Sequence, residues 1–132
     1  MDYKRVLFID DDVSLIKRYH KILQSKNLSD YFIYFESARE GLDYLKGIKD
    51  PGDLPDYLLL DLYMPEMNGF NFLGYFEKNE MLKEGMEVYV CTSSRRKEDR
   101  NKVMKYPFVS AYLEKPLSSE FIELLIMDST SC

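Results

Sequence analysis

The sequence predicts an α/β fold in which a doubly wound, five-stranded parallel sheet lies between helices. Two observations lead to this fold class. Five short apolar runs alternate along the chain with five segments of helical length, which is the pattern of repeated βα units. The run Tyr57–Leu60 is apolar at every position, as expected of a central parallel strand buried on both faces. Such units join their strands through right-handed crossovers.

The predicted strands are residues 6–9, 30–35, 57–60, 88–91 and 109–113. The second of these begins with polar side chains, which favours a position at the edge of the sheet. Residues 49–55 contain Pro51-Gly52 and Pro55, so this segment is predicted to be a loop. Pro107 interrupts the chain before the last strand.

Five helices are predicted between and after the strands: Val13–Ser25, a helix opening at Ser37, residues 68–79, residues 96–105 and a helix capped by Ser118. Ser37 and Glu40 have the spacing of a capping box. Side chains at helical spacing are expected to face the core. They are Ile16, Tyr19 and Leu23, then Leu42 and Leu45, then Phe72, Leu73 and Phe76, and finally Phe121, Leu124 and Leu125.

The composition is that of one globular domain, expected to span residues 1–127 and to be followed by a short tail, residues 128–132. Hydrophobic residues make up 45% of the chain, which includes 11 Tyr and 8 Phe, and this argues against disorder. The net charge of −5 disfavours nucleic acid as a partner.

The cysteines and the N-terminus indicate a reducing, cytoplasmic location. Cys91 lies inside an apolar run and Cys132 is the last residue, which indicates a buried thiol and a terminal one rather than a disulfide framework. Only four apolar residues follow the first five residues, too few for a signal peptide. No run is long enough to span a membrane, so no membrane association is expected.

Chemically reactive side chains follow four of the predicted strands. Asp10, Asp11 and Asp12 come directly after residues 6–9, and Asp61 comes directly after residues 57–60. Asp12 is expected to cap the first helix. Crowded carboxylates repel one another unless a cation is present, so Asp10 and Asp11 favour a hard cation such as Mg²⁺ over simple capping.

The other strand ends carry Asp61, Thr92 and Lys115, and each has an ordinary alternative role. Asp61 alone is equally well explained as a turn residue, Thr92 as a common strand-end residue and Lys115 as a solvated lysine. Because the carboxyl ends of parallel strands meet at one edge of the sheet, these side chains are expected to converge there. Together they favour a site that binds a cation and handles a phosphoryl group, with Asp61 as the nucleophile.

The chain resembles the receiver domains of two-component response regulators over essentially its whole length, especially the single-domain members typified by the chemotaxis regulator. The resemblance rests on residues 6–12 (VLFIDDD), 61–69 (DLYMPEMNG), 92–94 (TSS) and 113–116 (LEKP), of which residues 61–69 are the most specific. It implies a flavodoxin-like (βα)5 fold with strand order 2-1-3-4-5, and a bacterial two-component phosphorelay.

The resemblance also implies a role for each site residue. Asp61 would be the phosphoacceptor that forms an aspartyl phosphate. Asp11 would bind Mg²⁺ (or Mn²⁺) directly and Asp10 mostly through water, with Asp61 and the backbone carbonyl of Tyr63 as further ligands. Thr92 would donate a hydrogen bond to the phosphoryl group, and Lys115 would pair with it. The peptide bond between Lys115 and Pro116 is usually cis in this family.

Three further residues match positions that modulate the family's switch. Tyr112 matches the aromatic residue that turns inward as Thr92 moves towards the phosphate, although an ordinary strand aromatic would look the same. Tyr63 and Ser94 follow Asp61 and Thr92 by two residues, where members vary and tune dephosphorylation. Tyr63 is bulky enough to hinder an attacking water, so the phosphoryl group is expected to last longer than in members with small or amide residues at this position.

The function that the resemblance implies is a stand-alone receiver that takes phosphate from a sensor histidine kinase or a histidine phosphotransfer protein and hydrolyses it slowly. It would catalyse its own phosphorylation and dephosphorylation without turning over a separate substrate. Its downstream protein partner would bind the face formed by the fourth helix, the last strand and the last helix. A homodimer formed on phosphorylation is left open.

Two other functions compete with this one. One is a phosphatase or phosphotransferase that turns over small substrates through a phospho-aspartate. Such enzymes commonly carry an acid two residues after the nucleophile, and the presence of Tyr63 at that position argues against this function. A degenerate receiver could bind partners without phosphorylation, but Asp10, Asp11, Asp61, Thr92 and Lys115 are all present. His20 is interpreted as a surface or boundary residue, and the basic residues of 95–105 as a solvated helix face that could also dock a partner.

Overall fold

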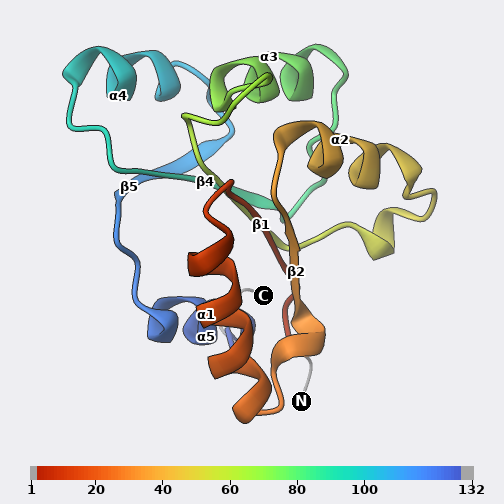
Figure 1. The fold of residues 1–132 in the computed structure, drawn as a ribbon. Coiled ribbons are helices and arrows are strands. Elements are labelled where there is room, and N and C mark those ends of the chain that lie inside the picture. Colours follow the sequence, from red (N-terminus) through yellow and green to blue (C-terminus); the bar gives the residue numbers. More distant parts are fainter. Residues whose placement is uncertain (1–2, 129–132) are drawn as a thin grey trace.

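The computed structural model describes residues 3–128 and contains a five-stranded parallel sheet with helices on both faces (Figure 1). The strands are β1 (Val6–Ile9), β2 (Phe32–Phe35), β3 (Tyr57–Leu60), β4 (Glu87–Thr92) and β5 (Val109–Glu114). The α-helices are α1 (Val13–Ser25), α2 (Ala38–Gly47), α3 (Gly69–Lys78), α4 (Lys97–Val103) and α5 (Ser119–Ile126). The predicted fold class is therefore confirmed.

The strands lie in the order β2-β1-β3-β4-β5, as the resemblance implied, with β2 at one edge. In the parallel pairing, Ile9 of β1 lies opposite Leu60 of β3, and Leu60 lies opposite Val90 of β4. The residues that follow these positions therefore leave the same edge of the sheet. All four residues of β3 are buried, as predicted for the central strand.

The two faces of the sheet have separate cores. Along β3, Leu58 and Leu60 pack with residues of α2 and α3 on one face, whereas Tyr57 and Leu59 pack with residues of α1 and α5 on the other. Figure 1 shows this division, with α2, α3 and α4 on one side of the sheet and α1 and α5 together on the opposite side. This alternation follows from the two-residue period of a strand, and it leaves the carboxyl edge of the sheet free for polar side chains.

Several predicted helix caps are confirmed. The side chain of Asp12 accepts a hydrogen bond from the Leu15 amide, Ser37 accepts one from the Glu40 amide, and Ser118 accepts one from the Phe121 amide. The capping box at Ser37 is only half formed, because its hydroxyl donates to the Glu40 carboxylate (3.1 Å). A complete capping box instead joins Asn68 and Asn71 at the start of α3.

Some predicted boundaries were wrong by one or two residues. Residues 29–31 form a 3-10 turn, so β2 begins at Phe32 rather than at residue 30. The predicted loop at residues 49–55 contains a second 3-10 turn, Pro51–Asp53. Helix α4 is shorter than residues 96–105, and β4 and β5 are longer than predicted. Hydrogen bonding to neighbouring strands extends β4 and β5 into polar residues that local hydrophobicity does not include.

The predicted burial of Leu124 was also wrong. Its side chain is 69% exposed, whereas Ile122, Leu125 and Ile126 are buried and Phe121 is half-buried. Residues 122, 125 and 126 have the i, i+3, i+4 spacing that selects one helix face, and Leu124 lies off that face. The direction in which α5 faces β1 and α1 decides which apolar side chains it buries.

Gly69, the first residue of α3, lies against the backbone that carries Asp61. A Cβ atom at this position would lie 2.5 Å from the carbonyl oxygen of Asp61 and 2.8 Å from the Cα of Leu62. The Gly69 amide also donates to the Leu62 carbonyl (2.7 Å). Any side chain at position 69 must therefore displace the segment that positions Asp61.

We expect Gly69→Ala to lower the free energy of unfolding by about 3 kcal/mol, because backbone atoms cannot yield as a flexible side chain can. Urea denaturation followed by circular dichroism measures this. Gly74→Ala in the same helix is the matched control. Its Cβ would meet only the Tyr106 hydroxyl at 3.6 Å, so it should be neutral or gain up to about 1 kcal/mol. Equal stability of the two variants would contradict the prediction.

Cys91 is buried, as predicted, and burial raises the pKa of its thiol to about 12. Cys132 lies outside the described residues, as do residues 129–131 of the predicted tail. Asp128, the first residue of that tail, accepts a hydrogen bond from the Tyr57 hydroxyl, so it is not a loose end. None of the helices within residues 3–128 combines the length and the apolar character needed to cross a membrane.

Candidate functional site

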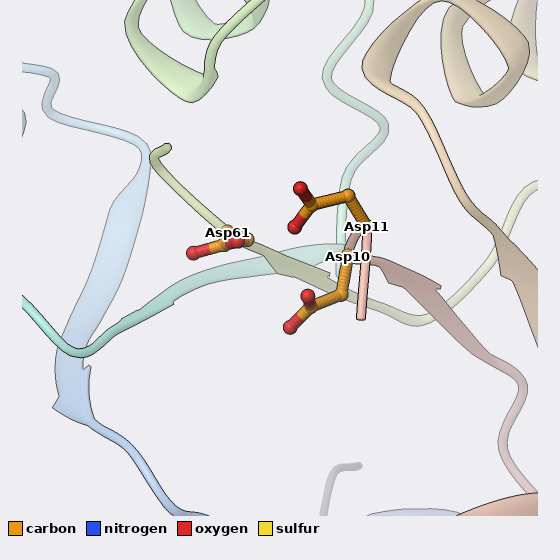
Figure 2. Close-up of side chains that lie close together, drawn as sticks. All are labelled: Asp10, Asp11 and Asp61. Atoms are coloured by element: carbon orange, nitrogen blue, oxygen red, sulfur yellow. The ribbon is translucent and has the colours of Figure 1, made fainter. Parts of the chain in front are cut away.

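Three aspartates meet at the carboxyl edge of the sheet, as the sequence predicts. Asp10 and Asp11 follow β1, and Asp61 follows the neighbouring strand β3 (Figure 2). One carboxylate oxygen from each lies within 4.8 Å of the other two. Asp10 and Asp61 are buried, with 1% and 6% of their surface exposed, and Asp11 is exposed. The cluster thus has a buried base and an opening on the Asp11 side.

Lys115 reaches this cluster from the loop that follows β5. Its Nζ lies 2.6 Å from Oδ2 of Asp10 and 3.4 Å from Oδ2 of Asp61. The backbone amide of Lys115 donates to the carbonyl of Thr92 (2.9 Å), and the Lys115–Pro116 peptide bond is cis, as the resemblance implied. The alternative of a solvated surface lysine is wrong, because only 19% of this side chain is exposed.

The charges of the cluster perturb one another. Burial raises the pKa of Asp61 to about 6; the charge of Asp10 raises it too, and Lys115 only partly offsets both. Burial acts to lower the pKa of Lys115, but the hydrogen bond and charge of Asp10, together with Asp61, outweigh it and raise that pKa. Three ionised carboxylates and one ammonium leave two net negative charges, which one divalent cation would balance.

The donor set fits a hard cation. All three side chains offer carboxylate oxygens, the ligands that Mg²⁺ prefers. Asp10 is held in place at both oxygens, because Oδ1 accepts from the Asp12 amide (3.0 Å) while Oδ2 pairs with Lys115. Asp11 remains exposed and free to approach an ion from solvent. The cluster therefore offers both a fixed and an adjustable carboxylate beside Asp61.

Thr92 and Tyr112 lie on the strands next to this cluster. Thr92 is the last residue of β4 and is buried, and its hydroxyl accepts a hydrogen bond from the Ser94 amide (3.2 Å). Tyr112 on β5 is half-buried with its hydroxyl enclosed, and Arg100 of α4 lies 5.9 Å from the centre of its ring. Burial raises the pKa of Tyr112.

Tyr63 and Ser94 meet at Asp99, a residue that the sequence analysis did not select. The hydroxyls of Tyr63 and Ser94 each donate to Oδ2 of Asp99 at 2.6 Å. Asp99 is only 5% exposed, whereas the basic residues around it, which were predicted to form a solvated helix face, are exposed. The hydrogen bonds from Ser94 and Tyr63 lower the pKa of Asp99. The signal in the sequence is its spacing from Val103, because residues i and i+4 share a helix face.

The family to which this chain belongs follows from a match to a family model. A model of the response regulator receiver domain matches residues 6–126. The chain belongs to the response regulator receiver domain family. The carboxylates, the threonine and the lysine described above thus lie in a receiver domain.

Solved receiver structures share this fold. A response regulator receiver protein from Dyadobacter fermentans is 29% identical and has a TM-score of 0.68, covering 92% of this chain and 94% of its own. A two-component response regulator from Cytophaga hutchinsonii has a TM-score of 0.78 at 23% identity, with 95% of each chain covered. The second likeness shows the fold alone.

A curated relative is much longer. A sensor histidine kinase of Helicobacter pylori is 28% identical to this receiver domain over 124 residues, which are 94% of this chain but 15% of the relative. The receiver domain therefore corresponds to a small part of that kinase.

Proposed function

We propose that this receiver domain accepts a phosphoryl group from a phosphohistidine onto Asp61, with Mg²⁺ bound by Asp10, Asp11 and Asp61. Phosphorylation of Asp61 then alters the contacts that the domain makes with other proteins. The observation that carries the proposal is the meeting of these three carboxylates within 4.8 Å beside the Lys115 ammonium. This arrangement combines a nucleophile, a cation site and a fixed positive charge at one sheet edge.

The chemistry requires little beyond positioning and charge neutralisation. An oxygen of Asp61 attacks phosphorus while the bond from phosphorus to the imidazole nitrogen breaks, which leaves a neutral donor histidine after it takes up a proton. Bound Mg²⁺, held also by the backbone carbonyl of Tyr63, would neutralise charge on the phosphoryl oxygens. Lys115, already 3.4 Å from Asp61, pairs with one of those oxygens, and the Thr92 hydroxyl donates to another.

The switch would act through Thr92 and Tyr112. The Thr92 hydroxyl, which accepts from the Ser94 amide, would move towards Asp61 and donate its proton to a phosphoryl oxygen. That movement shifts the loop after β4, and the Tyr112 ring then turns further inward. The proposed output face is formed by α4, β5 and α5. Arg100 of α4 and Tyr112 of β5 contact each other on this face. The phosphoryl group biases such a two-state equilibrium because its contacts are more favourable in one state than in the other.

The proposed phosphodonor is a sensor histidine kinase or a histidine phosphotransfer protein, and the proposed location is the cytoplasm. The relative from Helicobacter pylori, a sensor histidine kinase, supports the link to such kinases. The residues at the rim of the site, Tyr63 and Ser94, are proposed to set how long the phosphoryl group survives. Hydrolysis by this chain is proposed to be slow, because the bulky Tyr63 stands two residues from Asp61.

The test is intact-mass analysis after incubation with acetyl phosphate. We expect one phosphoryl adduct on the wild-type chain with Mg²⁺, and at least about 100-fold less in EDTA, because the metal supplies several kcal/mol of charge stabilisation. A receiver of known activity, labelled in parallel, controls for the reagent. If the control is labelled and this chain is not, the chain is a receiver that acts only as a binding module.

A further inference from the structure

Asp99 joins two loops that border the site. Its Oδ2 accepts hydrogen bonds from the Tyr63 hydroxyl and the Ser94 hydroxyl, both at 2.6 Å. Tyr63 lies in the loop between β3 and α3, and Ser94 lies in the loop between β4 and α4. One oxygen atom on α4 thus connects segments that are far apart in the sequence.

The position of these loops follows from the order of the strands. In the sheet, β3 lies between β1 and β4. Asp61 therefore has the carboxylates of Asp10 and Asp11 on its β1 side. On its β4 side lies the loop after β4, which Asp99 ties to the loop that carries Asp61 and Tyr63. The loops cannot separate there unless at least one of the two hydrogen bonds breaks.

The Tyr63 ring is held at both ends. Its hydroxyl binds Asp99, and its ring packs edge-to-face against Phe70 of α3, with the ring centres 6.1 Å apart. Nearly half of the Tyr63 surface is still exposed (49%). The ring is therefore fixed at the surface, two residues after Asp61, rather than buried in the core, and its position depends on Asp99 and Phe70.

Helix capping does not account for the burial of Asp99. The neighbouring Glu98 lies in the same first turn of α4, where acids are favoured by the helix dipole, and its side chain is 74% exposed. Asp99 in contrast is 5% exposed and contacts two loops. An ionised group is costly to bury unless it is paired or hydrogen-bonded, and the two hydroxyls provide those bonds.

We infer that Asp99 is a positioning residue that holds Tyr63 and Ser94 across the approach to Asp61 and so slows hydrolysis of the aspartyl phosphate. In that hydrolysis a water oxygen attacks phosphorus while the bond from phosphorus to the Asp61 oxygen breaks. The products are the carboxylate and inorganic phosphate, which takes both protons of the water. This inference rests on the proposed function of Asp61.

The experiment follows loss of the phosphoryl adduct by intact mass after acetyl phosphate is removed. We expect Asp99→Ala to lose the adduct about tenfold faster than the wild type, the factor that corresponds to one charged hydrogen bond. Its Mg²⁺ affinity should stay unchanged. Asp99→Asn keeps an oxygen acceptor and should stay within about threefold of the wild type, because neutral hydrogen bonds are weaker but present.

Two further variants separate positioning from a general structural effect. Glu98→Ala removes an exposed acid from the same helix turn, which pairs with Arg96 (3.6 Å) rather than with Tyr63 or Ser94, and it should leave the rate of adduct loss unchanged. Tyr63→Phe should speed the loss, and combining it with Asp99→Ala should give less than the product of the two single effects, as expected for groups that share a contact.

The outcomes distinguish the two proposals. A wild-type chain that takes up no phosphoryl group overturns both the proposed function and this inference. A labelled wild type whose Asp99→Ala variant loses the adduct at the same rate overturns the inference alone. Equal acceleration by Glu98→Ala and Asp99→Ala also overturns it, because the effect would then belong to the stability of α4.

Discussion

Replacing Asp61 with asparagine should abolish the metal-dependent phosphoryl adduct, with labelling by acetyl phosphate reduced at least about 1,000-fold because the nucleophile is removed. Asparagine keeps the size and leaves the neighbouring Asp10 and Asp11 in place, so the effect isolates the carboxylate. Intact-mass analysis in the presence of Mg²⁺ measures it. Asp43→Asn on the exposed side of α2 is the matched control and should be labelled like the wild type. An adduct on Asp61→Asn at the wild-type level would place the phosphoacceptor elsewhere.

The same variant should be more stable than the wild type in metal-free buffer at pH 7. The pKa of Asp61 is raised from 3.8 to about 6, so the folded state holds its proton more tightly than the unfolded state does. The contribution of Asp61 to the free energy of unfolding therefore falls as pH rises from about 4 to about 6 and is most unfavourable above that range. Asp61→Asn removes this cost, which we put at about 1–3 kcal/mol.

Urea denaturation in EDTA at pH 4 and pH 7 measures this difference. The gain from Asp61→Asn should be small at pH 4, where Asp61 is largely protonated, and full at pH 7. Adding Mg²⁺ at pH 7 should stabilise the wild type more than the variant, because only the wild type has all three carboxylates to bind the ion. A variant less stable than the wild type at pH 7 in EDTA would contradict the prediction.

Removing the side chain of Lys115 should lower both the free energy of unfolding and the labelling by acetyl phosphate, and this is the second largest effect that we expect. Lys115→Ala leaves Asp10 buried without its ion-pair partner at 2.6 Å and Asp61 without the ammonium at 3.4 Å. Breaking a buried pair in this way costs about 3–5 kcal/mol, so we expect a loss of that size in metal-free buffer at pH 7. Labelling by acetyl phosphate should fall about 100-fold, as when one preorganised donor is lost from a site of developing charge.

Mg²⁺ distinguishes these effects from simple unfolding. The cation replaces some of the lost positive charge, so it should restore more stability to Lys115→Ala than it adds to the wild type. Labelling should remain low even at saturating Mg²⁺, because the ion cannot occupy the position of the ammonium. Lys17→Ala, which removes an exposed lysine from α1, should match the wild type in both measurements. Full recovery of labelling with Mg²⁺ would show that Lys115 acts only on stability.

Much of the site could be predicted because parallel strands place their carboxyl ends at one edge. Asp10, Asp11 and Asp61 each follow an apolar run directly, so recognising the strands was enough to bring them together. The fold class and the cap at Asp12 depend on patterns within a few residues, and both were predicted correctly. The roles of Thr92, Tyr112, Tyr63 and Ser94 stay predictions, which the labelling experiments can test.

Other features depend on contacts between distant segments, and local sequence contains little trace of them. The exposure of Leu124 is set by the direction in which α5 faces the sheet. The burial of Asp99 depends on two hydroxyls that lie 36 and 5 residues away in the chain. Its neighbours Glu98 and Arg100 are charged and exposed, so charge alone does not distinguish Asp99 from a surface residue.

The sequence by itself determined the order of strands and helices along the chain and the polar residues at the strand ends, because these follow from short-range patterns of hydrophobicity. It also determined the family to which the chain belongs, because the family is recognised by short motifs. The tertiary structure alone decided that Asp10 is the nearest partner of Lys115, that Gly69 lies against the backbone of Asp61, and that Asp99 joins two loops. Each of these depends on distances between chain segments, which are set when the helices pack on the sheet and bury the polar groups that can find partners there.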